Sequence, residues 1–415
     1  MPKSDQCRCC GHKSFKMILD LGDQPWCNDF LSKEEVGHEK TYPLRLVSCT
    51  KCELLQLDYT VSKETMFQDH KYFSGMTKTL VNHFYEVAAE NISQFELGYG
   101  DLIVDIGGND GSQLQQYQKL GTHNVVNFES ALVVSHHSVK NGVPTINKFF
   151  NEETALKHFK KKSVKLYNAA GVFFHLEELH SVIRGIKKTL SDDGVLIVQF
   201  MYAGAMIEGK NFDTIYHEHL CYYTVNSLAN LLRPYGLEIF DGYHSSIHSG
   251  SVIAKICHAD SKLNTKTNRL LELEEKDKEY TIKAFEELAE EVKNSKNTLR
   301  EYLLGLKQEG KRIYVYGAPA KGNTLLNYFG IDNTLVEKAV EINKFKIGFY
   351  LPQSHIPVCD ESKDDLPDYY LLLSHNFAEE IIANNYDIIE KGVQFIIPFP
   401  TMKIISKKNL ERVSL

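Results

Sequence analysis

The sequence predicts an α/β protein of three parts: a small cysteine-containing module, a central domain built on a parallel sheet, and a second α/β domain. Three observations carry this prediction. Two C-x-x-C motifs lie near the N-terminus, and a strand followed by a small-residue turn and a helix occurs twice, beginning at Asp101 and at Ile313. Apolar runs of strand length also alternate with helical patterns, which is typical of parallel sheets. We place the parts at residues 1–75, 76–262 and 263–415.

Composition excludes several classes of protein. The chain has 415 residues and a formal net charge of -7, which gives no general attraction to nucleic acid or to an anionic membrane surface. No apolar run approaches the ~20 residues that span a bilayer, and the N-terminus lacks the apolar core of a signal peptide. We therefore expect a cytoplasmic protein, monomeric or a weak homo-oligomer, that binds neither nucleic acid nor membrane.

The first part carries a predicted metal site. Cys7 and Cys10 have the spacing that lets two thiolates bind one ion from a tight turn, and Cys49 and Cys52 repeat it. Two such motifs predict a tetrahedral zinc site, and the absence of a nearby water-activating ligand makes it structural. The alternatives are a redox dithiol or scattered buried cysteines. Cys9 does not fit the C-x-x-C spacing and is not counted as a ligand.

The central part begins with a strand that ends at Asp105 and enters a glycine-rich turn before a helix. Glycines let the backbone approach a ligand closely, and the helix start offers free N–H groups. The next strand ends in Glu129, where an acid can bind a ribose hydroxyl. The spacing is not G-x-G-x-x-G, which disfavours NAD. The form D-x-G-x-x-x-G is similar to class I methyltransferases that bind S-adenosylmethionine, and the candidate cofactor residues are Asp105, Gly107, Asn109, Gly111, Glu129 and His175.

Residues 216–219 (Tyr-His-Glu-His) carry the predicted chemistry. They follow an apolar run at 194–198 and precede a helical pattern at 225–232, so we predict a loop beyond the end of a strand, where α/β sheets bind ligands. Two imidazoles and a carboxylate within reach of one another can tune a histidine into a general base, with Tyr216 as donor to a developing oxyanion. The alternative is a surface hydrogen-bond network. Tyr72 and His248 each admit a functional and a purely structural reading.

The last part begins with charged helical residues at 263–310, which either form a joint packed on this chain's own domains or bind a partner helix. The second strand and turn follow at 313–320. Lys321, Asn323 and Thr324 stand at the start of the next helix, where a lysine charge and helix N–H groups suit a phosphate or diphosphate. The glycine spacing is not that of a Walker A loop.

Taken together, these motifs resemble the three-domain sugar C-methyltransferases, which act on nucleotide-linked 4-keto-6-deoxy sugars. The resemblance covers nearly the whole chain and rests on C-x-x-C twice, D-I-G-G-N-D-G, Y-H-E-H-L, H-S-G-S, G-A-P-A-K-G-N-T and Y-L-P-Q-S-H-I-P. It implies an N-terminal zinc module, a central Rossmann-like domain that binds S-adenosylmethionine, and a C-terminal Rossmann-like domain that helps to hold the nucleotide sugar.

The resemblance also implies roles for individual residues. His219 is the base, Tyr216, Glu218 and Tyr72 are its active-site companions, and the four cysteines of the paired motifs are the zinc ligands. The implied substrate-binding residues are Tyr72, His175, Tyr222, His248, Lys321, Asn323 and Thr324. The chain departs from the family at His248-Ser249-Gly250-Ser251 with Ile253 in place of H-G-G-S and an arginine, at Gly171 to His175, and at Ser374 to Phe377 in place of a tryptophan-containing segment.

The expected reaction is methylation at C-3 of a thymidine- or guanosine-diphosphate-linked 4-keto-6-deoxy sugar. Carbon is methylated only once it is a carbanion, and the adjacent ketone stabilises that charge as an enolate. If His219 is not the base, His217, His175 and His248 are next. The alternatives are methylation at C-5, methylation of an oxygen or nitrogen acceptor, and a zinc-ribbon protein that binds nucleic acid.

Overall fold

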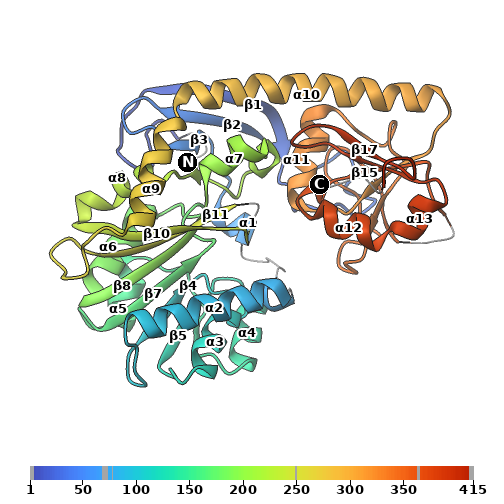
Figure 1. Ribbon diagram of the computed structural model, residues 1–415. Helices are drawn as coiled ribbons and strands as arrows, with labels where there is room; N and C mark the ends of the chain where they lie inside the picture. Colours follow the sequence, from blue (N-terminus) through green and yellow to red (C-terminus); the bar gives the residue numbers. More distant parts are fainter. Residues whose placement is uncertain (1–3, 68–72, 77, 248–249, 362–364, 411–415) are drawn as a thin grey trace.

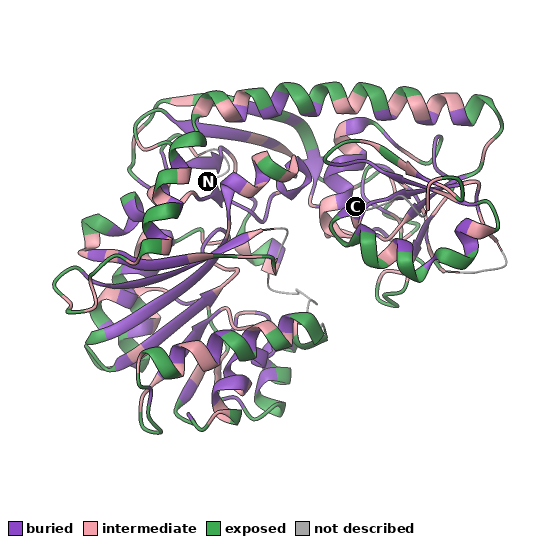
Figure 2. Cartoon of the chain, viewed as in Figure 1, coloured by how far each residue is buried: buried purple, intermediate pink, exposed green. Residues whose placement is uncertain are grey.

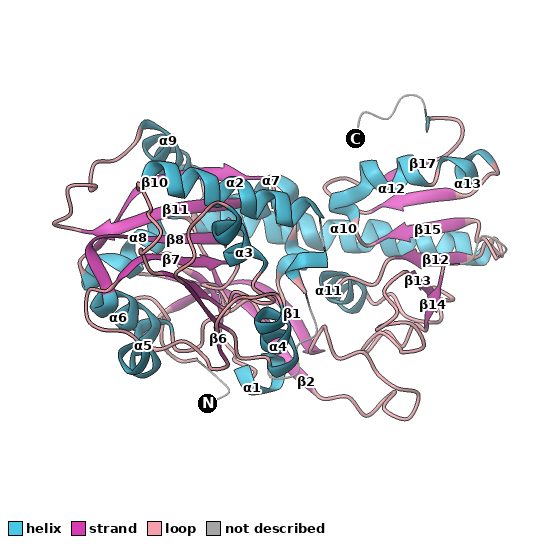
Figure 3. Cartoon of the chain, turned by 90° about the horizontal axis from the view of Figure 1, so that it is seen from below, coloured by secondary structure: helices cyan, strands magenta, loops and turns pink. Residues whose placement is uncertain are grey.

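The computed structural model describes residues 4–67, 73–76, 78–247, 250–361 and 365–410. Within these ranges the chain forms three sheets, and a long helix, α10 (Ile282–Gln308), lies across the top of the molecule in Figure 1. Figure 3 shows α10 passing from the body with the central sheet to the body with the C-terminal sheet. The predicted α/β class is confirmed. No helix of the described residues combines the length and apolarity needed to cross a membrane.

The N-terminal sheet is antiparallel, with the strand order β1-β2-β3-β9. Leu44 and Leu46 are buried on β2 at the two-residue spacing that places side chains on one face of a strand. The strand β9 comes from far along the chain, so the predicted boundary at residue 75 does not enclose the whole sheet. The bounds are β1 (Phe15–Pro25), β2 (Thr41–Cys49), β3 (Leu55–Leu57) and β9 (Cys221–Tyr222), with α1 (Lys63–Phe67) after β3.

The central sheet has the order β10-β11-β8-β7-β4-β5-β6, in which β8, β7, β4, β5 and β6 run parallel and β11 is antiparallel to both of its neighbours. The chain changes direction across the sheet between β4 and β7, which is where such sheets open a ligand crevice at their carboxyl ends. The strands are β4 (Ile103–Ile106), β5 (Val125–Phe128), β6 (Thr145–Ile146), β7 (Val164–Ala170), β8 (Leu190–Met201), β10 (Leu237–Ser245) and β11 (Ser251–His258).

Helices cover both faces of the central sheet. Apolar side chains of α2 and α3 form a core with one face, and those of α5 and α6 form a core with the other. The helix predicted at 225–232 is α8, with Thr224 as its capping residue, since its side chain accepts a hydrogen bond from the Ser227 N–H. The helices are α2 (Lys78–Gln94), α3 (Ser112–Lys119), α4 (Leu132–Lys140), α5 (Glu152–His158), α6 (Leu179–Thr189), α7 (Ala203–Gly209) and α8 (Val225–Leu232), with short turns η1 (Ser74–Met76), η2 (Phe212–Thr214) and η3 (Arg233–Tyr235).

The C-terminal sheet has the order β14-β13-β12-β15-β16-β17 and is parallel except for β17. The strands are β12 (Ile313–Tyr316), β13 (Ala339–Glu341), β14 (Val358–Asp360), β15 (Tyr369–Leu372), β16 (Gln394–Ile397) and β17 (Lys403–Ile405). The remaining elements are α9 (Asn268–Lys276), η5 (Asp277–Glu279), α11 (Ala320–Phe329), η6 (His375–Phe377), α12 (Ala378–Asn384) and α13 (Tyr386–Glu390).

The helix α10 packs on this chain, as one of the two sequence readings predicts. Its buried face, which includes Leu288, Val292 and Leu303, contacts β1, α7 and α11. Figure 2 shows the opposite face of the helix exposed along its length. One continuous cluster of buried apolar side chains contains Leu44 of the N-terminal sheet, Phe200 of the central sheet and Phe329 of α11. The three parts therefore share a core.

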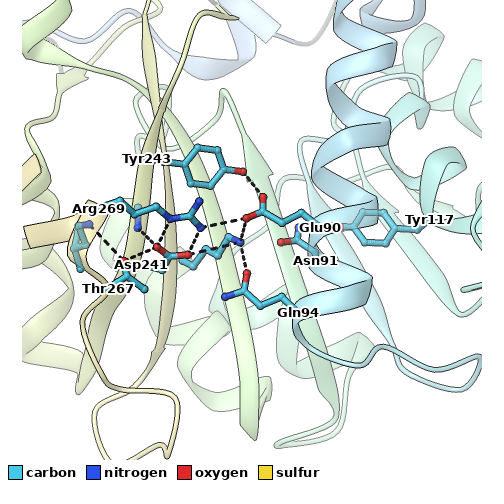
Figure 4. Close-up of polar contacts among 11 residues, drawn as sticks. Glu90, Asn91, Gln94, Tyr117, Asp241, Tyr243, Thr267 and Arg269 are labelled. Carbon is cyan, nitrogen blue, oxygen red and sulfur yellow. Dashed lines mark hydrogen bonds and ion pairs between the residues drawn. The ribbon is translucent and has the colours of Figure 1, made fainter. Parts of the chain in front are cut away.

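A buried charge network fastens α2 and α9 to the edge of the central sheet (Figure 4). The Lys255 side chain on β11 is fully buried, with its Nζ 2.7 Å from Glu90 Oε1 and 3.8 Å from Asp241 Oδ2. Arg269 of α9 contacts the same two carboxylates. Burial alone would raise the pKa of Asp241, but Arg269, Thr267 and Lys255 lower it to about 2.

Replacing Asp241 with alanine should destabilise the protein by about 3–5 kcal/mol, because it leaves Lys255 and Arg269 to share one carboxylate in a buried site. Urea unfolding followed by circular dichroism measures the change. Since the pKa of Asp241 is depressed in the folded state, its contribution is present above about pH 4 and is lost as the pH falls towards 2.

The matched control is Lys162→Ala, which removes an ion pair with Asp192 between two largely exposed side chains. This variant should unfold at the same urea concentration as the wild-type protein. Equal urea midpoints for wild type, Asp241→Ala and Lys162→Ala would contradict a stabilising role for the network.

Candidate active site and metal centre

Residues 216–219 lie where the three parts of the molecule meet. On one side, Phe212 of η2 stacks on Phe329 of α11, with ring centroids 5.3 Å apart and planes 11° apart. On the other side, the Leu220 carbonyl accepts a hydrogen bond of 3.0 Å from the Leu57 N–H of the N-terminal sheet. The predicted loop is therefore held at its two ends by the C-terminal and N-terminal parts.

The two histidines that face each other here have defined tautomers. His219 Nδ1 lies 2.7 Å from the Thr214 carbonyl oxygen, and His175 Nδ1 lies 2.6 Å from the Glu218 carbonyl oxygen. A carbonyl only accepts, so Nδ1 carries the proton in both rings and Nε2 is the basic nitrogen. Their ring centroids are 5.1 Å apart. The structure thus offers two imidazole bases at one place.

Tyr216 packs against His219, with ring centroids 3.8 Å apart. Burial and the neighbouring Glu218 carboxylate raise the pKa of Tyr216 well above its ordinary value of 10. Its phenol therefore keeps its proton at neutral pH and is a hydrogen-bond donor beside the imidazole.

His217 turns towards the N-terminal part instead. Its Nε2 donates to the Tyr42 carbonyl at 3.2 Å, and the ring is 1% exposed. Burial lowers the pKa of His217 to about 4, so this imidazole is neutral at physiological pH and a weak base. Of the histidines considered as bases, His217 therefore differs from His219 and His175, because it faces the N-terminal part and is a weak base.

Glu218 is held by the N-terminal part. Its Oε1 accepts hydrogen bonds of 2.6 Å from the Trp26 indole N–H and of 2.6 Å from the Asn28 amide. The residue is 5% exposed, and a buried carboxylate is stable only when donors surround it. These two hydrogen bonds fix the side chain of Glu218, which lies between His217 and His219 in the sequence.

The glycine turn after β4 has the backbone conformation that its sequence predicts. Gly107 and Gly111 have φ values of 65° and 79°, and a Cβ at Gly111 would lie 2.6 Å from Ser138 Oγ. Asn109 has a φ of 52°, and its N–H donates to Glu129 Oε2 at 3.1 Å. Val172, after β7, stands against Gly107. The turn and Glu129 are thus brought together at the carboxyl ends of β4 and β5.

The charges at this turn fit a cationic ligand. Asp105 is 1% exposed, and its carboxylate oxygens have no hydrogen-bond partner among the described residues. Burial and Glu129 raise the pKa of Asp105, and burial raises that of Glu129. The sulfonium and ammonium groups of S-adenosylmethionine would offset this accumulation of buried acids. The His175 ring packs against aromatic side chains, with its centroid 4.4 Å from that of Phe174 and 5.3 Å from that of Phe67, and its backbone N–H donates to the carbonyl of Val172.

The second turn, between β12 and α11, places its polar residues differently from the expected open phosphate site. Lys321 Nζ lies 3.8 Å from Asp213 Oδ2, and Asn323 donates to the Cys27 carbonyl at 2.6 Å. Asn323 and Thr324 are each 1% exposed. Lys346, which the sequence reasoning missed, donates to the Ala318 carbonyl of the turn at 2.7 Å. Two lysines therefore flank this turn.

Three other predicted residues stand as follows. Tyr222 is buried on β9, with its hydroxyl 3.4 Å from the Thr214 carbonyl oxygen. Tyr72 and His248 lie outside the described residues. The segment that follows Tyr72 crosses the glycine turn, since the Gly75 N–H donates to Asp110 Oδ2 at 2.9 Å.

Four more residues at the site escaped the sequence reasoning: Trp26, Asn28, Asp213 and His375. One had a signal, because Trp26 is the sole tryptophan of the chain. The others are common polar residues whose role appears only through contacts with distant segments, such as the 2.8 Å hydrogen bond between His375 Nε2 and Asp213 Oδ2.

The four predicted metal ligands converge. The Sγ atoms of Cys7, Cys10, Cys49 and Cys52 all lie within 4.8 Å of one another, with Cys7 and Cys52 3.5 Å apart and Cys10 and Cys49 3.7 Å apart. Sulfur atoms around tetrahedral zinc, at Zn–S distances of about 2.3 Å, are about 3.8 Å apart. The Cys9 and Lys51 N–H groups point at ligand sulfurs. The donor set fits a closed, structural zinc site.

Comparison with known proteins agrees with this geometry. Residues 7–67 match the family model of a zinc binding domain, residues 81–241 that of a methyltransferase domain, and residues 246–400 that of a C-methyltransferase C-terminal domain. Among solved structures, similar chains include geranyl diphosphate methyltransferase in complex with S-adenosylmethionine (10% identity, 44% of this chain and 91% of that chain, TM-score 0.34) and the YcgJ protein from Bacillus subtilis (9% identity, 43% and 99%, TM-score 0.35).

The three matched domains, the glycine turn and the cysteine cluster define the chain as an S-adenosylmethionine-dependent C-methyltransferase with an N-terminal zinc module. Along its length it is similar to the C-methyltransferase NovU of Streptomyces niveus, with 29% identity over 98% of each chain.

Replacing Cys49 with serine should abolish stoichiometric zinc and lower the melting temperature, because three thiolates do not close a tetrahedral structural site. Zinc content by atomic emission and thermal unfolding measure both effects. Cys9→Ser is the matched control, since Cys9 lies outside the cluster, and it should keep one zinc per chain. Full zinc in Cys49→Ser would rule out the four-cysteine site.

Proposed function

We propose that this enzyme methylates C-3 of a nucleotide-diphosphate-linked 4-keto-6-deoxy sugar through an enolate. The observation that carries the proposal is the contact of Tyr216 with His219, which sets a protonated phenol beside an imidazole whose Nδ1 bears the proton. Carbon methylation next to a ketone needs both groups, a base for the α proton and a donor for the oxygen that becomes negative. The sugar as acceptor rests on the Y-H-E-H-L and G-A-P-A-K-G-N-T motifs.

The proposed step balances as follows. His219 Nε2 takes the proton from C-3, and the electron pair of the C–H bond moves to form the enolate, whose oxygen receives a hydrogen bond from Tyr216. The enolate carbon would then form its bond to the methyl group while the sulfur–methyl bond breaks, with the bonding electron pair left on the sulfur of S-adenosylhomocysteine, and the proton on His219 passes to solvent. S-adenosylmethionine supplies an electrophilic methyl group when bound. The Glu218 side chain is fixed by hydrogen bonds from Trp26 and Asn28, and its backbone carbonyl accepts the hydrogen bond from His175 Nδ1.

The nucleotide end of the substrate is proposed to lie against the turn between β12 and α11. Lys321 and Lys346 flank this turn, and their positive charges suit a diphosphate. Because Asn323 and Thr324 are buried against neighbouring segments, their predicted contact with the substrate requires local rearrangement. The carrier is proposed to be thymidine or guanosine diphosphate, and C-5 methylation is the alternative outcome of the same chemistry.

Replacing His219 with asparagine should abolish methyl transfer and also the exchange of the acceptor α proton with solvent deuterium, because the basic nitrogen is lost. Mass spectrometry of a 4-keto sugar nucleotide incubated in D₂O with S-adenosylhomocysteine measures exchange apart from transfer. His136→Asn, on the exposed surface of α4, is the matched control and should exchange normally. Exchange retained in His219→Asn would move the base to another residue, first His175.

Calorimetry should show that S-adenosylhomocysteine binds, and that the resulting complex binds one of thymidine diphosphate and guanosine diphosphate more tightly than the other. The nucleotide that binds names the carrier. If the methyl-donor product binds and neither nucleotide does, the proposed acceptor is wrong. Lys346→Ala should weaken nucleotide binding by about 10- to 150-fold and leave donor binding unchanged, since a charged hydrogen bond contributes about 1.5–3 kcal/mol.

A further inference from the structure

The short turn η2 belongs to the central part by sequence, yet its side chains are buried in the C-terminal part. Phe212 is fully buried. Its ring centroid lies 5.3 Å from that of Phe399, and the ring also stacks on Phe329. The next residue, Asp213, is also fully buried. The C-terminal part therefore fixes the position of the segment that leads into residues 216–219.

Asp213 is held by two residues of the C-terminal part. His375 Nε2 donates to Asp213 Oδ2 at 2.8 Å, and Lys321 Nζ lies 3.8 Å from the same oxygen. Burial alone would raise the pKa of Asp213, but Lys321 and His375 bring it below its ordinary value, so the carboxylate is ionised at neutral pH. A buried ionised group that is paired in this way moves only at high cost in free energy.

Thr214 follows directly, and its carbonyl is the acceptor that sets the tautomer of His219. The His219 Nδ1–H donates to this oxygen at 2.7 Å, and the Thr214 hydroxyl donates to the Asn211 carbonyl at 2.6 Å. One peptide link therefore separates a side chain anchored in the C-terminal part from the atom that orients the imidazole. A shift of this peptide by about 1 Å would release the ring, a scale of misplacement that costs an enzyme about 100-fold in rate.

We propose that Asp213 is a positioning residue for His219, and that its contacts with His375 and Lys321 make the orientation of the imidazole depend on the C-terminal domain. The inference deepens the proposed function, because it assigns to the nucleotide-binding domain a part in aligning the base. Asp213 acts on His219 through the Thr214 peptide.

The geometry predicts which nitrogen of His219 carries the proton. With the Thr214 carbonyl in place, the proton stays on Nδ1 and Nε2 is the base. Without it, the neutral ring also populates the form with the proton on Nε2, which cannot accept the substrate proton at that nitrogen. Loss of Asp213 should therefore change the tautomer of a ring that it does not contact.

The test compares wild type with Asp213→Asn, which keeps the shape of the side chain and removes its charge. Nitrogen-15 NMR of histidine-labelled protein reports the tautomer without any substrate, and His219→Asn assigns the signal. We expect the Nδ1–H form in wild type, a mixture in Asp213→Asn, and a fall of about 100-fold in deuterium exchange. Binding of S-adenosylhomocysteine and zinc content should be unchanged, which shows that the variant is folded.

A second pair of variants separates positioning from general damage. His375→Gln keeps an N–H donor for Asp213 and should retain the Nδ1–H form, whereas His375→Ala should not. A wild-type tautomer in Asp213→Asn would overturn the proposal, whether or not exchange is lost. A tautomer change with no exchange in wild type would instead leave the positioning role standing and count against the proposed function.

Discussion

The buried carboxylate of Glu218 imposes the constraint around which the three parts are arranged. Taking a carboxyl group out of water costs several kcal/mol unless hydrogen-bond partners replace the solvent, and two of its partners, Trp26 and Asn28, lie on the N-terminal part. The N-terminal part must therefore dock on residues 216–219 for the site to be stable. The cysteine cluster joins two turns of the sheet that also contains β9, and β9 follows directly after residues 216–219 and Leu220.

Fixed charges distinguish the two sides of the active site. Asp105 and Glu129, both with raised pKa values, stand at the turn after β4, whereas Lys321 and Lys346 flank the turn after β12. Under the proposed function, the acids at the first turn face the cationic methyl donor, and the lysines at the second turn face the anionic diphosphate. The loop with Tyr216 and His219 lies between the parts that carry these turns.

Local patterns predicted the local features of this molecule. The spacing of Cys7 and Cys10 and the glycines after β4 are constraints within a few residues, and the structure confirms the cysteine cluster and the turn conformation. The contacts that complete the site join residues far apart in sequence, as Trp26 and Glu218 do, and no local pattern encodes them. The same limit explains Asn323: its place at a helix start indicated an exposed ligand group, but the N-terminal part packs over it. The roles of individual site residues remain predictions from sequence and geometry.

The pairing of β3 with β9 has a consequence for biosynthesis. As the chain leaves the ribosome, β1, β2 and β3 emerge early, and the edge of β3 stays without its neighbour until the strands β4 to β8 have been made. An open strand edge is a site of mispairing during synthesis. All four cysteine ligands lie within the first 52 residues, so the metal can bind and stabilise the early strands before β9 is synthesised. The cell's zinc supply thus bears on the yield of folded enzyme.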